Sequence, residues 1–143
     1  MVCTFFGHRD TPDTVAPVLR RVIEELILRH GVSLFYVGHR GNFDAMAIRL
    51  LAEMERKYGC RFFVVLPYLP RRPDPFLPPS NTILPDGFEG FPPRYAIDRA
   101  NRWMLAQSDI VVTCVNHATG GAARWKETAR KQGKTVIELT EQC

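Results

Sequence analysis

Short apolar runs alternate with longer amphipathic segments along the whole chain. The apolar runs predict five strands, at residues 2–6, 33–37, 61–66, 109–115 and 135–139. Between these runs, apolar residues recur at helical spacing and predict helices at 11–30, 42–58, 94–107 and 120–133. An alternation of strands and helices is typical of a parallel sheet with helices on both faces.

The predicted fold is therefore one α/β domain over residues 1–143, a three-layer Rossmann-like parallel sheet of five strands. Right-handed crossovers and one reversal of direction give the spatial strand order 3-2-1-4-5. The reversal falls between the first and fourth strands, and ligands bind at such a reversal in open parallel sheets. The loops after the first, second and fourth strands are expected to meet there.

The ends of the elements carry turn and capping residues. Thr11 is a candidate N-cap for the first helix, and Asn42 is a candidate N-cap for the second. Nine of the eleven prolines lie in residues 67–93, where neither helical nor strand periodicity is found. This segment is predicted to be a long loop, which is either a lid or binding loop or a plain surface excursion.

Composition and charge limit the classes of function. No apolar stretch approaches the roughly 20 residues that span a bilayer, and no signal segment is recognisable, so we expect a cytoplasmic protein without membrane contact. The cysteines and histidines do not have zinc-ligand spacing, so neither a metal nor a cofactor is expected. A net charge of +4 suits phosphate-bearing ligands and would also suit nucleic acid.

The loop after the fourth strand has the pattern of an anion site. Gly120 and Gly121 open a helix, whose N-terminal N–H groups and dipole favour a phosphate; the alternative is a tight turn without a ligand. Thr119 would cap this helix or donate to the phosphate. Arg9 and Arg40 each follow a strand and would pair with phosphate, unless they form surface salt bridges.

Other polar residues near the same edge have alternative roles. His8 would bind a ribose hydroxyl, act as an acid or base, or bond to its own loop. Asn116 would read a base or ribose edge, or form a turn. Arg102 lies four residues after Asp98 and predicts an exposed ion pair, which leaves Arg99 as the ligand candidate of this helix.

Four stretches of the chain together resemble the SLOG superfamily, the Rossmann-like domains of DprA and Lonely-guy proteins. The likeness is greatest to the small bacterial YpsA-like group. The stretches are Thr4 to Arg9, Gly38 to Ala47, Arg99 to Asp109, and Thr119 to Gly121 with Gly133-Lys134. The resemblance implies a nucleotide or nucleotide-derived ligand and association into a homo-oligomer.

The resemblance also implies roles for residues of the first two stretches. Gly7 would help to cradle phosphate, and Gly38 and Asn42 would contribute to the same ligand site. Asp44 would hold a ribose or orient a neighbouring arginine, whereas stabilisation of the helix dipole is its alternative role.

Lonely-guy enzymes carry a Gly-Gly-x-Gly-Thr-x-x-Glu motif. The matching stretch here runs from Gly120 to Glu127, with Ala123 and Arg124 in place of the third glycine and the threonine. If the resemblance extends to catalysis, Glu127 is the carboxylate that would assist cleavage of an N-glycosidic bond. Pairing of Glu127 with a neighbouring basic side chain is the alternative.

Three hypotheses follow from the sequence. The first is a protein that binds a nucleotide-derived molecule, similar to ADP-ribose, at the carboxyl edge of the sheet and serves as a sensor. The second is a hydrolase that acts on nucleoside 5′-monophosphates through Glu127. The third is a DprA-like module for single-stranded nucleic acid, which requires a continuous basic surface with exposed aromatic residues.

Overall fold

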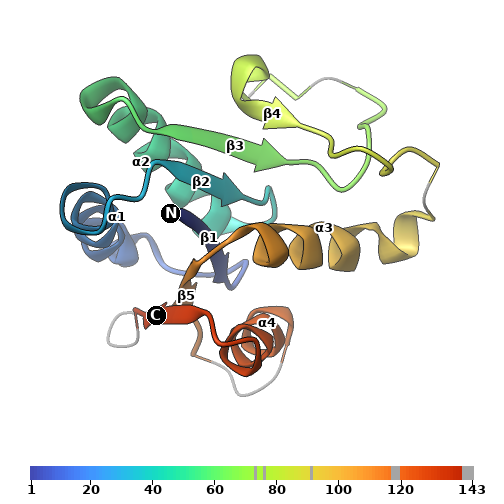
Figure 1. Cartoon of the computed structure of the whole chain (residues 1–143). Helices are drawn as coiled ribbons and strands as arrows, with labels where there is room; N and C mark the ends of the chain where they lie inside the picture. The colour runs from blue at the N-terminus through green and yellow to red at the C-terminus, as the bar shows by residue number, and fades with distance from the viewer. Residues whose placement is uncertain (73, 76, 91, 117–119, 140–143) are drawn as a thin grey trace.

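Strands and helices alternate along the chain in the computed structural model, which describes residues 1–72, 74–75, 77–90, 92–116 and 120–139 (Figure 1). The strands are β1 (Val2–Gly7), β2 (Leu34–Val37), β3 (Arg61–Val65), β4 (Thr82–Ile83), β5 (Ile110–Cys114) and β6 (Thr135–Glu138). The α-helices are α1 (Ala16–His30), α2 (Asn42–Tyr58), α3 (Pro93–Gln107) and α4 (Gly121–Lys131). Two 3-10 turns are η1 (Asp13–Val15) and η2 (Pro79–Asn81).

The strands form one sheet in the order β4-β3-β2-β1-β5-β6, and every described strand pair is parallel. The five predicted strands are neighbours in the predicted order, but the predicted number is one too small. The additional strand is β4, which pairs with the last two residues of β3 inside the segment predicted to be a loop. A two-residue strand among prolines leaves no period-2 pattern in the sequence, so it could not be predicted.

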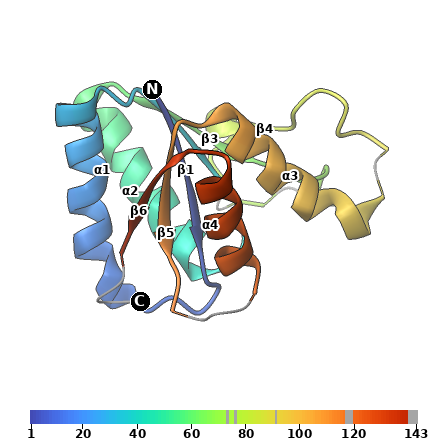
Figure 2. The ribbon, with the colours of Figure 1, turned by 60° about the horizontal axis from the view of Figure 1, so that its bottom comes forward.

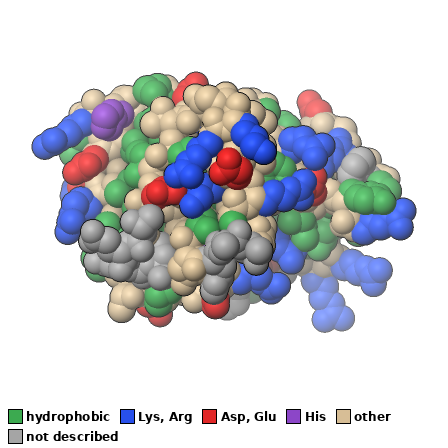
Figure 3. Space-filling model, turned by 90° about the horizontal axis from the view of Figure 1, so that it is seen from below, with side chains coloured by type: hydrophobic (Ala, Val, Ile, Leu, Met, Phe, Trp, Pro, Cys, Tyr) green, Lys and Arg blue, Asp and Glu red, His purple; other side chains and the backbone are tan. Residues whose placement is uncertain are grey.

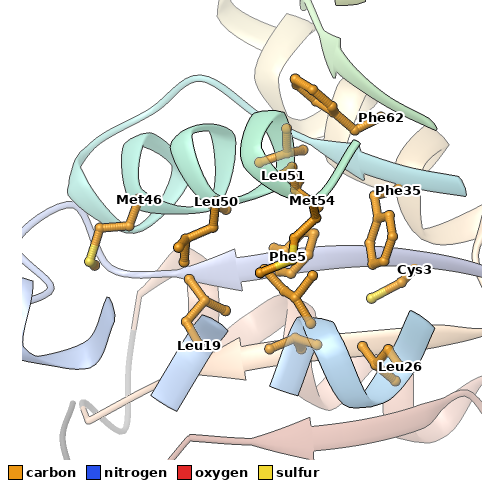
Figure 4. Packing of buried hydrophobic residues seen from close by; sticks show 14 of the residues in the cluster. Cys3, Phe5, Leu19, Leu26, Phe35, Met46, Leu50, Leu51, Met54 and Phe62 are labelled. Carbon is orange, nitrogen blue, oxygen red and sulfur yellow. The ribbon is translucent and has the colours of Figure 1, made fainter. Parts of the chain in front are cut away.

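The helices cover both faces of the sheet and give three layers, with α1 and α2 on one face and α3 and α4 on the other (Figure 2). On the first face, Leu50 and Met54 of α2 and Leu19 of α1 pack against Phe5 of the sheet (Figure 4). Each such side chain stabilises the fold by roughly 1.5–3 kcal/mol on burial. This apolar layer fixes the angle at which α2 meets the ends of the strands.

The central strands are buried on both faces because helices cover both sides of them. All five residues of β5 are buried, as are the four middle residues of β1. Such strands read as continuous apolar runs without alternation, and this is why they were recognisable in the sequence.

The starts of α1 and α2 differ from the predicted caps. Neither Thr11 nor Asn42 caps its helix through its side chain. The Thr11 hydroxyl donates to the His8 carbonyl at 2.8 Å, and the Asn42 side-chain amide donates to the Thr11 carbonyl at 2.6 Å and to Asp13 Oδ1 at 2.8 Å. The Thr11 bond lies within the loop after β1, whereas the Asn42 bonds tie this loop to the start of α2.

Within the described residues, no helix has the length and apolar character that a membrane crossing requires.

Asn81 holds the β4 segment to the body of the sheet, and a substitution of Asn81 tests how much this attachment stabilises the fold. Its buried side-chain amide donates to the Glu55 carboxylate at 3.0 Å and to the Phe62 carbonyl at 3.0 Å. We expect Asn81→Ala to lower the free energy of unfolding by roughly 1–3 kcal/mol, because it leaves buried acceptors without a donor. Urea unfolding measures this effect.

The matched control is Asn116→Ala, since the Asn116 side chain is exposed. It should change the free energy of unfolding by less than about 0.5 kcal/mol. Equal effects of the two substitutions would show that Asn81 does not anchor this segment.

Candidate functional site

A cavity of about 190 Å³ lies at the carboxyl-terminal edge of the sheet, beside the ends of β1 and β2. It contains seven of the residues selected from the sequence: Gly7, His8, Arg9, Gly38, Arg40, Asp44 and Gly121. Four segments meet here, namely the loops after β1 and β2 and the first turns of α2 and α4. This is the side of the β1–β5 reversal at which open parallel sheets bind ligands.

The other predicted site residues do not line this cavity. Asn42 is held by the loop after β1, Asn116 is exposed, and Gly120 is exposed at the N-cap of α4. Glu127 is exposed on α4. Thr119 lies outside the described residues.

Arg99 points toward a different part of the chain. Its guanidinium donates to the Gly87 carbonyl and lies 4.3 Å from the centre of the Phe88 ring. Arg99 therefore fastens the segment before α3, whereas its neighbour Arg102 forms the expected pair with Asp98 at 3.0 Å.

Other side chains fill the space beside Gly7, at the end of β1, and beside Gly38, in the loop after β2. A Cβ on Gly7 would overlap the ring of Phe43, which is fully buried in the first turn of α2. A Cβ on Gly38 would lie 2.9 Å from Asp44 Oδ2. Gly7 and Gly38 thus shape the cavity by allowing close packing of α2 against the strand ends.

The glycines at α4 have no such packing partner. A Cβ on Gly121 would meet no protein atom within 4 Å, and the backbone of Gly121 has no positive φ. Gly120 adopts φ +105°, a conformation that favours glycine. The absence of a side chain at Gly121 is not required by the fold and leaves room for another molecule.

Three backbone amides in the loops around the cavity have acceptors within the protein. The Arg40 amide donates to Asp44 Oδ2 at 2.9 Å, and the Asn42 amide donates to the Arg9 carbonyl at 2.9 Å. The Asn116 amide donates to His8 Nε2 at 3.1 Å, so the neutral His8 ring carries its proton on Nδ1. These three bonds join the loops after β1 and β2 and the end of β5 to one another.

The first turn of α4 is different, because the first N–H groups of a helix have no intrahelical acceptor. The first helical bond of α4 runs from the Arg124 amide to the Gly120 carbonyl at 3.1 Å. Among the residues that the structure describes, nothing accepts from the amides of Gly121 and Ala122, and both residues line the cavity. This turn combines open donors with the positive end of a helix dipole.

Positive charge stands at the mouth of the cavity. Arg9 and Arg40 come from neighbouring loops, and both are exposed. Neither guanidinium forms an ion pair with any residue in the described part of the chain. Within the described residues, the salt-bridge interpretation of these two arginines therefore finds no support.

Asp44 is the buried charge of the site. Asp44 is 9% exposed, and this burial raises the pKa of its carboxyl from 3.8 to about 7. The hydrogen bond from the Arg40 amide and the charge of the Arg40 guanidinium act in the opposite direction and lower this pKa. Near neutral pH the Asp44 carboxyl is therefore partly protonated, a state suited to hydrogen-bond donation as well as acceptance.

Sequence reasoning missed the wall formed by α3 and α4. Ile97, Asn101 and Met104 line the cavity from one face of α3, and Trp125 lines it from α4 while stacking on Phe6 at 5.9 Å. The i, i+4, i+7 spacing of the three α3 residues places them on one face and could have revealed them. The Asn101 side-chain amide forms no hydrogen bond with other described residues, so it is available to a ligand.

The parallel sheet and the cavity at its reversal define a Rossmann-like α/β protein with a candidate anion site. A comparison of the sequence with protein-family models finds none that matches, and a search of curated proteins finds no match either. The function is therefore inferred from the geometry of the site.

The buried Asp44 carboxyl gives stability a specific dependence on pH. Its pKa is higher in the folded protein than in the unfolded chain, so its stabilising contribution is complete below about pH 4 and is lost as pH rises through about 7. Above pH 7 the cost is about 4 kcal/mol for a pKa that moves from 3.8 to about 7. We expect Asp44→Asn to remove this loss, because asparagine keeps the acceptor for the Arg40 amide without titrating.

Urea unfolding of wild type and Asp44→Asn at about pH 5, 7 and 8.5 measures the difference. The variant should gain stability relative to wild type by roughly 3 kcal/mol between pH 5 and 8.5, because the remainder of the loss falls below pH 5. A difference between the two proteins that is the same at every pH would show that Asp44 ionises normally in the folded state.

Proposed function

We propose that this protein binds a nucleotide or a nucleotide-derived molecule, similar to ADP-ribose, and holds a phosphate at the N-terminus of α4. The observation that carries the proposal is that the amides of Gly121 and Ala122, two residues that line the cavity at the reversal of the sheet, have no acceptor among the described residues. A helix N-terminus with open amides is a general phosphate site. The resemblance of the sequence to the SLOG superfamily supports the same class of ligand.

Two arginines add charge to this proposed phosphate site. Arg9 and Arg40 lie on separate loops, so together they would contact a phosphate or diphosphate from two sides. Charge-assisted hydrogen bonds of arginine to phosphate are about twice as strong as neutral ones. Because neither arginine forms an ion pair with a described residue, ligand binding would not first have to break such a salt bridge.

The size of the cavity limits how much of the ligand it would enclose. Pockets for drug-sized ligands measure about 300–1,000 Å³. A cavity of about 190 Å³ fits a phosphate with its ribose, while the rest of the ligand would extend to the surface. Asn101 and the buried Trp125 supply the polar and apolar wall that a sugar requires.

The two other functions suggested by the sequence have less support. Glu127 is exposed and does not line the cavity, so its position gives the glycosidase hypothesis no support. On the face that carries α4, basic side chains are interspersed with acidic ones (Figure 3). Arg124 pairs with Asp98 at 2.7 Å, and Lys126 and Arg130 pair with Glu138, which leaves no continuous basic track on this helix for nucleic acid.

A substitution that adds one methyl group separates ligand binding from folding. Gly121→Ala should leave the free energy of unfolding within about 0.5 kcal/mol of wild type, because the added Cβ meets open space. The same methyl group would stand against a phosphate on the α4 amides, and we expect at least about tenfold weaker binding of ADP-ribose. Calorimetric titration and thermal shift, with AMP and NAD as further ligands, measure this.

Gly31→Ala is the matched control. Gly31 has φ +69° at the distant end of α1, so alanine there should destabilise the fold by roughly 1 kcal/mol and leave ligand affinity unchanged. If the folded wild-type protein binds none of the three ligands at millimolar concentration, the proposed function is wrong. If Gly121→Ala binds as tightly as wild type, the phosphate does not lie on α4.

A further inference from the structure

The two oxygens of the Asp44 carboxyl differ in their surroundings. Oδ2 accepts the Arg40 amide at 2.9 Å, which holds the carboxyl in place. Oδ1 forms no hydrogen bond with a described residue, and Asp44 lines the cavity. Because the Arg40 amide already donates to Oδ2, Oδ1 is the carboxyl oxygen left for a hydrogen bond with a ligand in the cavity.

The position of the Asp44 carboxyl is set by packing. The residue lies in the first turn of α2, next to Phe43, whose ring is fixed against Gly7. Gly38 lacks the side chain that would displace Oδ2. Rotation of the carboxyl out into water would break its hydrogen bond with the Arg40 amide.

Few charged groups face Asp44. The loop after β1 contributes His8 and Arg9, and the loop after β2 contributes Arg40. His39, in the same loop, is paired with Asp74 at 3.0 Å. The cavity residues of α3 and α4 are uncharged, namely Ile97, Asn101 and Met104 with Gly121, Ala122 and Trp125.

An anionic ligand in this cavity would stand beside the Asp44 carboxyl. An ionised carboxylate repels a phosphate, and in a partly buried site that repulsion is only weakly screened. A neutral carboxyl instead donates a hydrogen bond to a phosphate oxygen. The pKa of about 7 for Asp44 means that the neutral form is accessible at little cost near neutral pH.

We propose that the cavity binds its anionic ligand together with one proton, and that Asp44 carries this proton and donates a hydrogen bond from Oδ1 to the ligand. Asp44 would then determine specificity, because it favours ligands that present an unprotonated acceptor oxygen at this point. The inference rests on the proposed function and adds to it the coupling between ligand affinity and pH.

ADP-ribose is the probe, because the charge of its diphosphate stays constant between about pH 6 and 8.5. If only the neutral form of Asp44 binds, the dissociation constant of wild type should be roughly 30-fold higher at pH 8.5 than at pH 6. Titration near pH 7 in two buffers with different ionisation enthalpies should show net uptake of protons on binding.

Asp44→Asn mimics the neutral carboxyl with an amide of the same shape. The variant should bind ADP-ribose with the same affinity at both pH values, take up no protons, and bind more tightly than wild type at pH 8.5. Glu25→Gln removes an exposed carboxylate on α1 and should keep the full pH dependence of wild type. A general loss of fold in Asp44→Asn would be detected by its urea unfolding curve and would not produce tighter binding at high pH.

The outcomes separate this inference from the proposed function. Binding of ADP-ribose by wild type with no proton uptake, or an unchanged pH dependence in Asp44→Asn, would overturn the inference and leave the proposed function standing. The absence of ADP-ribose binding by folded wild type at both pH values would overturn both.

Discussion

The contact between the Phe43 ring and the backbone of Gly7 holds the site together. Phe43 is fully buried, and its ring occupies the space that a side chain at Gly7 would need. The first turn of α2 therefore packs directly on the end of β1. Gly41 lies just as close to Arg9, because a Cβ on Gly41 would overlap the Arg9 backbone. Because of these two contacts, the loops after β1 and β2 form one unit and place Asp44 inside the cavity.

Hydrogen bonds in and around that unit use three backbone amides. Its amides at Arg40 and Asn42 donate to Asp44 and to the Arg9 carbonyl, and His8 accepts the amide of Asn116. The first turn of α4 lines the cavity too, and its Gly121 and Ala122 amides have no acceptor in the part of the chain that the structure describes. The site therefore divides into a fixed side, which supplies charge and a buried carboxyl, and an open helix end, which supplies donors. This division is the basis for placing a phosphate at α4 and a titrating carboxyl opposite it.

Much of the fold could be predicted from the sequence, because buried parallel strands and amphipathic helices have strong periodic patterns. The edge of the sheet that carries the site followed from strand order, and seven predicted residues do line the cavity. β4 could not be predicted, since two residues give no pattern and its pairing depends on the tertiary contacts of Asn81. The Thr11 and Asn42 caps were wrong because Thr11 bonds within its own loop, before a helix that begins only at Ala16, and Asn42 bonds to the Thr11 carbonyl, which is distant in sequence. The orientation of Arg99 depends on Gly87 and Phe88, which no local pattern relates to it.

The most direct test of the central claim is a record of which backbone amides respond to a phosphate-bearing ligand. The measurement is an NMR titration of the ¹⁵N-labelled protein with ADP-ribose, following each assigned amide to saturation. We expect the largest shifts at Gly121 and Ala122, where the amides are open, and small shifts at Arg40 and Asn42, where they are already bonded. Shifts concentrated at Arg40 and Asn42, or on a surface remote from the α4 N-terminus, would contradict the account.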